Sequence, residues 1–163
     1  MLAAAMNPCP CGHFPNRKKC NCSENQIKAY QRKISQPILD RIDISVSVND
    51  VNYNELDVKE KGEASTKIRE RVMKTMKIQQ ERYKNEAINF NSQLTSKMMG
   101  DYCKLGNEEK SLMENAYSKF SLSARAYHRI LKVARTIADM DASTDIKVPH
   151  LMEALCYRGF DVG

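Results

Sequence analysis

Hydrophobic and polar residues alternate with a period of two near the start of the chain. One face of this segment is aliphatic and the other polar: Ile42, Ile44, Val46 and Val48 against Asp43, Ser45, Ser47 and Asn49. The alternation predicts a half-buried β-strand. The residues before it (33–40) predict a short helix, so Arg41 is expected at the edge of a sheet, between helix and strand.

A second strand is predicted at residues 2–6, which form an uninterrupted apolar run. Continuous apolar runs of this length are typical of strands buried on both faces. A fold rarely begins with a central strand. We therefore expect the chain to be the C-terminal part of a longer protein.

After Asn49 the hydrophobic period changes from two to 3.6. A polar loop is followed by predicted helices over residues 64–83, 93–103, 123–140 and 149–157, with one more starting at Asn107 as its N-cap. The first helix is expected to bury Ile68, Val72, Met76 and Tyr83. In helix 123–140 the predicted apolar stripe is Ala126, Ile130, Val133, Ala134 and Ile137, with Arg125, Arg129, Lys132 and Arg135 off it. Together these segments predict a bundle of four or five helices.

Composition adds little to this picture. The chain has 163 residues and a net charge of +6, from 26 Lys+Arg against 20 Asp+Glu. A positive surplus favours polyanionic partners without identifying one. No apolar run approaches the ~20 residues that a membrane helix needs. We expect a soluble, cytoplasmic protein.

Four of the six cysteines form two close pairs, Cys9 with Cys11 and Cys20 with Cys22. Two such pairs joined by a short loop can surround a tetrahedral Zn²⁺ with four thiolates, although structural zinc sites usually leave two to four residues between paired cysteines. His13 is an alternative ligand. Two disulfides, or four plain thiols, remain alternatives. Cys103 and Cys156 fit small buried apolar groups.

Two arginines have positions that suit anion binding. Arg41 follows a helix end, where its planar fork could reach a phosphate of a neighbouring molecule or simply be solvated. Arg125 lies in the first turn of its helix, where a cation is unfavourable because the helix dipole is positive at that end. Either an anion binds there, or the Arg125 side chain points away into water. The chain contains no G-x-x-x-x-G-K-[ST] sequence for cradling a nucleotide's phosphates.

Several strings together resemble the magnesium-chelatase-related AAA+ ATPases of the ComM/YifB type. They are AAMNPCPCG at 4–12, CNC at 20–22, KISQPILDRID at 33–43, GEAS at 62–65, and LSARAYHRILKVARTIAD at 122–139. The resemblance spans nearly the whole chain. Gln36 and Ala64 depart from the family pattern, and neither is a proposed contact residue.

The resemblance implies a mostly α fold: a helical-bundle AAA+ lid preceded by a fragment of the α/β core. Residues 1–50 would be the core remnant, with two strands and a Cys-rich insert at 9–22. Residues 51–62 would be a linker and 63–163 the helical lid. In the parent, the strand that enters the phosphate loop would lie between these two strands. Without it, residues 1–50 are not expected to form the sheet. Their amide protons are therefore expected to exchange faster than those of the helices.

The resemblance also implies roles for three residues. Asn7 resembles the sensor-1 residue that orients the attacking water. Arg41 resembles an arginine finger that reaches across a subunit boundary, and Arg125 resembles a sensor-2 arginine that contacts the γ-phosphate in its own subunit. The implied cofactors are ATP and Mg²⁺ in the intact parent, with Zn²⁺ at Cys9, Cys11, Cys20 and Cys22.

The implied function is a DNA-remodelling or translocating ATPase that works as a hexameric homo-oligomeric ring, with this part inactive alone. Arg17, Lys18 and Lys19 are the candidate DNA-contacting cluster, or else a solvated loop that balances the metal site. Two alternatives remain. One is a stand-alone zinc-binding, nucleic-acid-binding module; the other is the ATPase subunit of a magnesium chelatase in chlorophyll synthesis.

Overall fold

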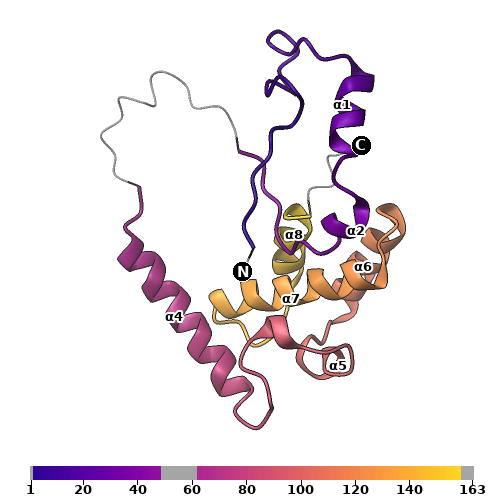
Figure 1. Ribbon diagram of the computed structural model, residues 1–163. Coiled ribbons are helices and arrows are strands. Elements are labelled where there is room, and N and C mark those ends of the chain that lie inside the picture. Colours follow the sequence, from indigo (N-terminus) through magenta and orange to yellow (C-terminus); the bar gives the residue numbers. More distant parts are fainter. Residues whose placement is uncertain (1, 49–61, 159–163) are drawn as a thin grey trace. The chain divides into compact units, whose positions relative to one another are not determined.

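The computed structural model describes residues 2–48 and 62–158 (Figure 1). Almost all of the predicted linker therefore lies outside the described residues. The chain divides into two compact units, Met1–Ile42 and Asp43–Gly163. Each unit has its own buried cluster of residues.

The first unit contains helix α1 (Glu24–Gln31) and the four-residue helix α2 (Gln36–Leu39). Helix α1 starts with a capping box, in which the Ser23 hydroxyl accepts from the Gln26 amide and the Gln26 side chain accepts from the Ser23 amide. This box satisfies two amides that the first helical turn leaves without partners. The sequence analysis did not predict α1, although its S-x-x-Q signature is readable at residues 23–26.

Neither predicted strand is formed in this chain: over residues 2–48 and 62–158 the structure contains no β-strand. Leu2, Met6 and the alternating aliphatic residues of 44–48 are exposed rather than buried. Strands need neighbouring strands to pair their amides and carbonyls. No partner strand lies within the described residues.

The second unit is a helical bundle. Its elements are α4 (Ser65–Arg82), the 3₁₀ turn η1 (Asn91–Gln93), α5 (Met99–Tyr102), α6 (Asn107–Lys119), α7 (Ala124–Met140) and α8 (Val148–Cys156). Helix α7 lies at the centre and packs against α8, α4 and η1 (Figure 1). The predicted mostly α fold is thus confirmed. The single helix predicted over 93–103 was wrong, since that region forms η1, a turn and α5.

Helix α7 forms as the sequence predicts. Ser123 is its N-cap, and its hydroxyl accepts from the Ala126 amide. Ala126, Ile130 and Ala134 are fully buried along one stripe. The predicted N-cap of α6 was wrong by one residue: Gly106 is the N-cap and Asn107 the first helical residue.

Helix α4 corrects two further predictions. Ile68 and Val72, which were expected in the core, are exposed, while Thr75, Gln79 and Tyr83 are buried at helical spacing. The buried face of α4 is therefore polar in two of three positions. Its contacts with α7 depend on hydrogen bonds more than on apolar packing.

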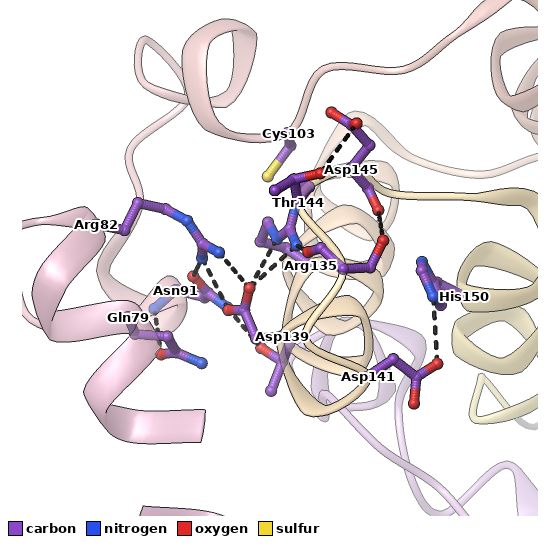
Figure 2. Close-up of polar contacts among 12 residues, drawn as sticks. Gln79, Arg82, Asn91, Cys103, Arg135, Asp139, Asp141, Thr144, Asp145 and His150 are labelled. Carbon is purple, nitrogen blue, oxygen red and sulfur yellow. Dashed lines mark hydrogen bonds and ion pairs between the residues drawn. The ribbon is translucent and has the colours of Figure 1, made fainter. Parts of the chain in front are cut away.

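Asp139 of α7 is the centre of these contacts (Figure 2). Its side chain is completely buried and accepts hydrogen bonds from Arg82 of α4, from Arg135, and from the Asn91 amide group at 2.9 Å. Arg135 also donates to the carbonyls of Ser143 and Thr144 beyond the helix end, at 2.6 and 2.8 Å. Arg135 was predicted to lie off the apolar stripe; it is nevertheless buried, because this carboxylate and these carbonyls accept its hydrogen bonds.

Within the described residues, no helix combines the length and apolarity needed to span a bilayer.

We predict that Asp139→Asn lowers the free energy of unfolding by about 3–5 kcal/mol, because it leaves the charges of Arg82 and Arg135 uncompensated in a buried site. Urea denaturation measures this. The matched control is Arg71→Gln, which removes an exposed pair with Glu63 at 2.7 Å and should cost less than about 1 kcal/mol. Equal losses in the two variants would contradict the central role of Asp139.

Candidate metal centre and arginine sites

The four sulfur atoms of Cys9, Cys11, Cys20 and Cys22 all lie within 4.8 Å of one another. Three separations are 3.4 Å (Cys9 to Cys11), 3.8 Å (Cys9 to Cys20) and 3.6 Å (Cys11 to Cys20). Four sulfurs around a tetrahedral Zn²⁺, each about 2.3 Å from the ion, would be about 3.8 Å apart. The cluster can therefore hold a metal ion, and its spacing fits four-thiolate zinc despite the tight Cys-x-Cys pairs.

Two turns bring the pairs together. The Gly12 amide donates to the Cys9 carbonyl at 3.0 Å, and Gly12 has a φ of 82°, a left-handed conformation that favours glycine. In the second turn the Cys20 amide donates to the Asn16 carbonyl at 2.9 Å, which returns the chain to the first pair.

Hydrogen bonds divide the thiols into two kinds. A hydrogen bond from the His13 amide lowers the pKa of Cys11 to about 6, which outweighs the effect of burial. Burial acts to raise the pKa of Cys9, but the Phe14 amide, 3.4 Å from its sulfur, and other hydrogen bonds bring it below the ordinary value. The pKa of Cys22 is raised to about 11: the Cys11 amide lowers it, but burial and the neighbouring thiols outweigh that effect. Cys20 is raised in the same way, against the lowering effect of the Cys22 amide. These shifts make Cys9 and Cys11 easier to deprotonate than Cys20 and Cys22, and the thiolate is the form that metal ions bind.

The cysteine cluster is also the core of the first unit. Cys9, Cys20 and Ile27 of α1 are its buried residues, and Phe14 packs against them. Three buried side chains bury far too little apolar surface to order some 40 residues. A bound metal would supply the missing stability.

Basic residues surround this cluster. Arg17 lies over the Phe14 ring at 5.1 Å from its centroid and pairs with Glu24 at 3.4 Å. Lys18 and Lys19 are exposed. These lysines are accessible to an anionic partner.

Arg41 follows α2 as predicted, but on a turn and not at the edge of a sheet. Its side chain is exposed, and its guanidinium donates to the Pro37 carbonyl at 2.7 Å. Asn7 is also exposed and lies close to Gly12, where a Cβ would be 3.6 Å from its side-chain nitrogen. Both residues belong to the first unit.

Arg125 is exposed in the first turn of α7, in the second unit. It lines a shallow depression of about 450 Å³ with Ser96, Ala124, His128, Arg129 and Lys132. Lys132 donates to the Ser92 carbonyl at 2.9 Å, and partial burial lowers its pKa. Three cationic side chains in one depression attract an anion.

Sequence reasoning identified Arg125 but not its cationic neighbours. Arg129 and Lys132 follow Arg125 by four and seven residues, a spacing that places all three on one helix face. Helical periodicity could therefore have found them. Cys103 is buried as expected, whereas Cys156 is exposed, contrary to expectation.

We predict that the purified chain contains one zinc per molecule and that Cys9→Ser removes it. Loss of the metal should also reduce the ellipticity from α1, since Ile27 packs on the sulfur cluster. Elemental analysis and circular dichroism measure both effects. Cys156→Ser is the matched control, because that cysteine is exposed and outside the cluster. Zinc retained in the Cys9 variant, or absent from the wild type, would exclude this site.

The sequence matches known protein families over most of its length. Residues 62–158 match the family described as "Magnesium chelatase, subunit ChlI C-terminal", and residues 1–56 match "Magnesium chelatase, subunit ChlI". The competence protein ComM of Haemophilus influenzae is 44% identical over 158 residues, covering 96% of this chain and 30% of ComM. YifB of Escherichia coli (strain K12) is 37% identical over 161 residues, covering 98% of this chain and 31% of YifB. The chain thus spans about 30% of the length of these relatives.

Proposed function

This chain belongs to the magnesium chelatase family, with ComM and YifB among its relatives, and on that premise we propose that it forms the C-terminal part of an oligomeric AAA+ ATPase. In this proposal residues 1–50 complete the ATPase core and residues 63–163 form its lid. The chain lacks a phosphate-binding loop, so it supplies side chains to a nucleotide site that the rest of the protein builds. Alone it is inactive.

The observation that carries the proposal is the cationic depression at the start of α7. Arg125, Arg129 and Lys132 line it, and the first-turn amides of α7 lie at the same helix end. Helix N-termini and cations together favour a phosphate group. Arg125 is the proposed sensor-2 residue, which contacts the γ-phosphate.

Arg41 is the proposed arginine finger. Its exposed guanidinium lies in a turn beyond α2 and can exchange its contact with the Pro37 carbonyl for a phosphate of an adjoining subunit. Phosphoryl transfer is catalysed mainly by positioning and by stabilising charge on the transferred group, which a planar guanidinium does well. Asn7 is the proposed sensor-1 residue, with an exposed amide that can orient water.

The cysteine cluster is proposed to bind structural Zn²⁺ with four thiolates. A closed four-cysteine site leaves no ligand position for substrate, so this metal would stabilise the fold and take no part in hydrolysis. The intact ATPase would bind Mg²⁺ with ATP through residues outside this chain. Magnesium there neutralises phosphate charge.

The polymer on which the ATPase acts is proposed to be DNA. The exposed Lys18 and Lys19, next to Cys20 in the sequence, offer phosphate contacts, and the chain carries a net charge of +6.

Replacing both lysines by glutamine should weaken DNA binding by the complete protein and flatten its salt dependence. Filter binding at several salt concentrations measures this, with Lys110→Gln and Lys119→Gln on α6 as the control. An unchanged salt slope would remove this loop from the DNA interface.

For the complete ATPase we predict that Arg41→Ala lowers kcat by about 10³-fold or more, as loss of an arginine finger does. Arg125→Ala should lower it by about 10²-fold, as loss of one charge-stabilising donor does. Arg32→Ala and Arg69→Ala are the matched controls. Both arginines are exposed, at the C-cap of α1 and on α4, and neither is a proposed phosphate contact. Normal turnover in both test variants would refute the proposed function.

A further inference from the structure

The segment that follows the proposed finger is held to the helical unit by polar contacts. The Ser45 amide donates to the Tyr157 carbonyl at 2.7 Å, and the Asp43 carboxylate pairs with Arg129 at 2.9 Å. The aliphatic side chains of Ile44, Val46 and Val48 are exposed. Apolar burial therefore contributes little to the placement of this segment.

The ion pair connects two regions that matter for the proposed function. Asp43 comes two residues after Arg41, so their Cα atoms are within about 7 Å of each other. Arg129 comes one helical turn after Arg125, and both line the same depression. The pair thus holds Asp43, two residues after the proposed finger, on the helix that carries Arg125.

We propose that Asp43 and Arg129 are positioning residues, whose ion pair fixes the start of the segment after the finger on helix α7 and so limits where Arg41 can reach. This inference rests on the proposed function and adds to it a contact that governs the finger. Asp43 need not touch nucleotide for this role, whereas Arg129 also lines the proposed phosphate-binding depression.

The exposure of the two partners indicates how the pair acts. The Arg129 side chain is 24% exposed and that of Asp43 is 68% exposed. Such pairs add little to global stability, because water screens them. The pair should therefore affect the local order of residues 43–48, and through it the finger, without unfolding the bundle.

Electrostatic attraction to the neighbouring cations also favours this position of the Asp43 carboxylate. Arg125, Arg129 and Lys132 line the same depression, and like charges at this spacing repel. The Asp43 carboxylate offsets part of that repulsion and acts to raise the pKa of Lys132 against the larger effect of burial. Removing it would leave the cations without this counter-charge.

The first test uses this chain itself. Arg129→Ala and Asp43→Ala should each speed amide exchange at Ser45 by up to about fivefold, the range expected for an exposed pair, while the Leu131 amide inside α7 stays unchanged. Exchange measured by NMR reports both sites. Unchanged exchange at Ser45 in both variants would overturn the inference.

The second test uses the complete ATPase. Asp43→Ala should lower kcat by about tenfold to a hundredfold with little change in KM, because a displaced catalytic group costs turnover more than binding. Arg129→Lys should keep most of the activity, and the Asp43→Ala/Arg129→Ala double variant should be no slower than the slower single variant. Arg71→Ala, which breaks the exposed pair with Glu63, is the control and should keep full turnover.

Mixing experiments separate this inference from the proposed function. Asp43→Ala subunits mixed with Arg41→Ala subunits should turn over no faster than Asp43→Ala subunits alone, since neither supplies a well-placed finger. A mixture of Asp43→Ala subunits with a phosphate-loop lysine variant should gain turnover above that level. If Arg41→Ala abolishes turnover and Asp43→Ala leaves it normal, only the inference fails. If Arg41→Ala is itself normal, the proposed function fails first.

Discussion

The helical unit depends on one buried carboxylate. Asp139 collects hydrogen bonds from α4, from η1 and from its own helix, and Arg135 extends the network to the carbonyls after α7 (Figure 2). The buried face of α4 is largely polar, so apolar packing alone would not orient this helix on α7. A buried charge of this kind favours one arrangement because other arrangements leave it without partners. The start of α7, with Arg125, is positioned by this arrangement.

The first unit obeys a different constraint. Two of its buried side chains, Cys9 and Cys20, belong to the sulfur cluster, and two turns bring the cysteine pairs together. On the proposal that this cluster binds Zn²⁺, order in this unit depends on the metal, whereas order in the helical unit depends on Asp139 and the apolar stripe of α7. The two proposed phosphate-contacting arginines thus belong to units stabilised by different chemistry: Arg41 lies in the first unit and Arg125 in the second.

Sequence patterns predicted the helical unit well where local signals and burial agree. Ser123 and the stripe containing Ala126 and Ile130 predicted α7 correctly, and the cysteine pairs predicted the cluster of four sulfurs, which could hold a metal ion. The patterns failed where residues distant in sequence decide burial. Arg135 is buried because Asp139 and two carbonyls accept its hydrogen bonds. Val46 is exposed, and the described residues contain no strand that could pair with its segment. Ile68 was misplaced for a similar reason, since apolar periodicity does not reveal whether a partner surface is present.

The central claim is that Arg41 completes the nucleotide site of an adjoining subunit, and mixed assemblies test it most directly. Complete ATPase carrying Arg41→Ala would be combined with a variant that lacks the phosphate-loop lysine, each inactive alone, and ATP turnover measured as their ratio is varied. Recovery of turnover, greatest near equal proportions, is the predicted result. No recovery at any ratio, from subunits shown to assemble together, would contradict the account.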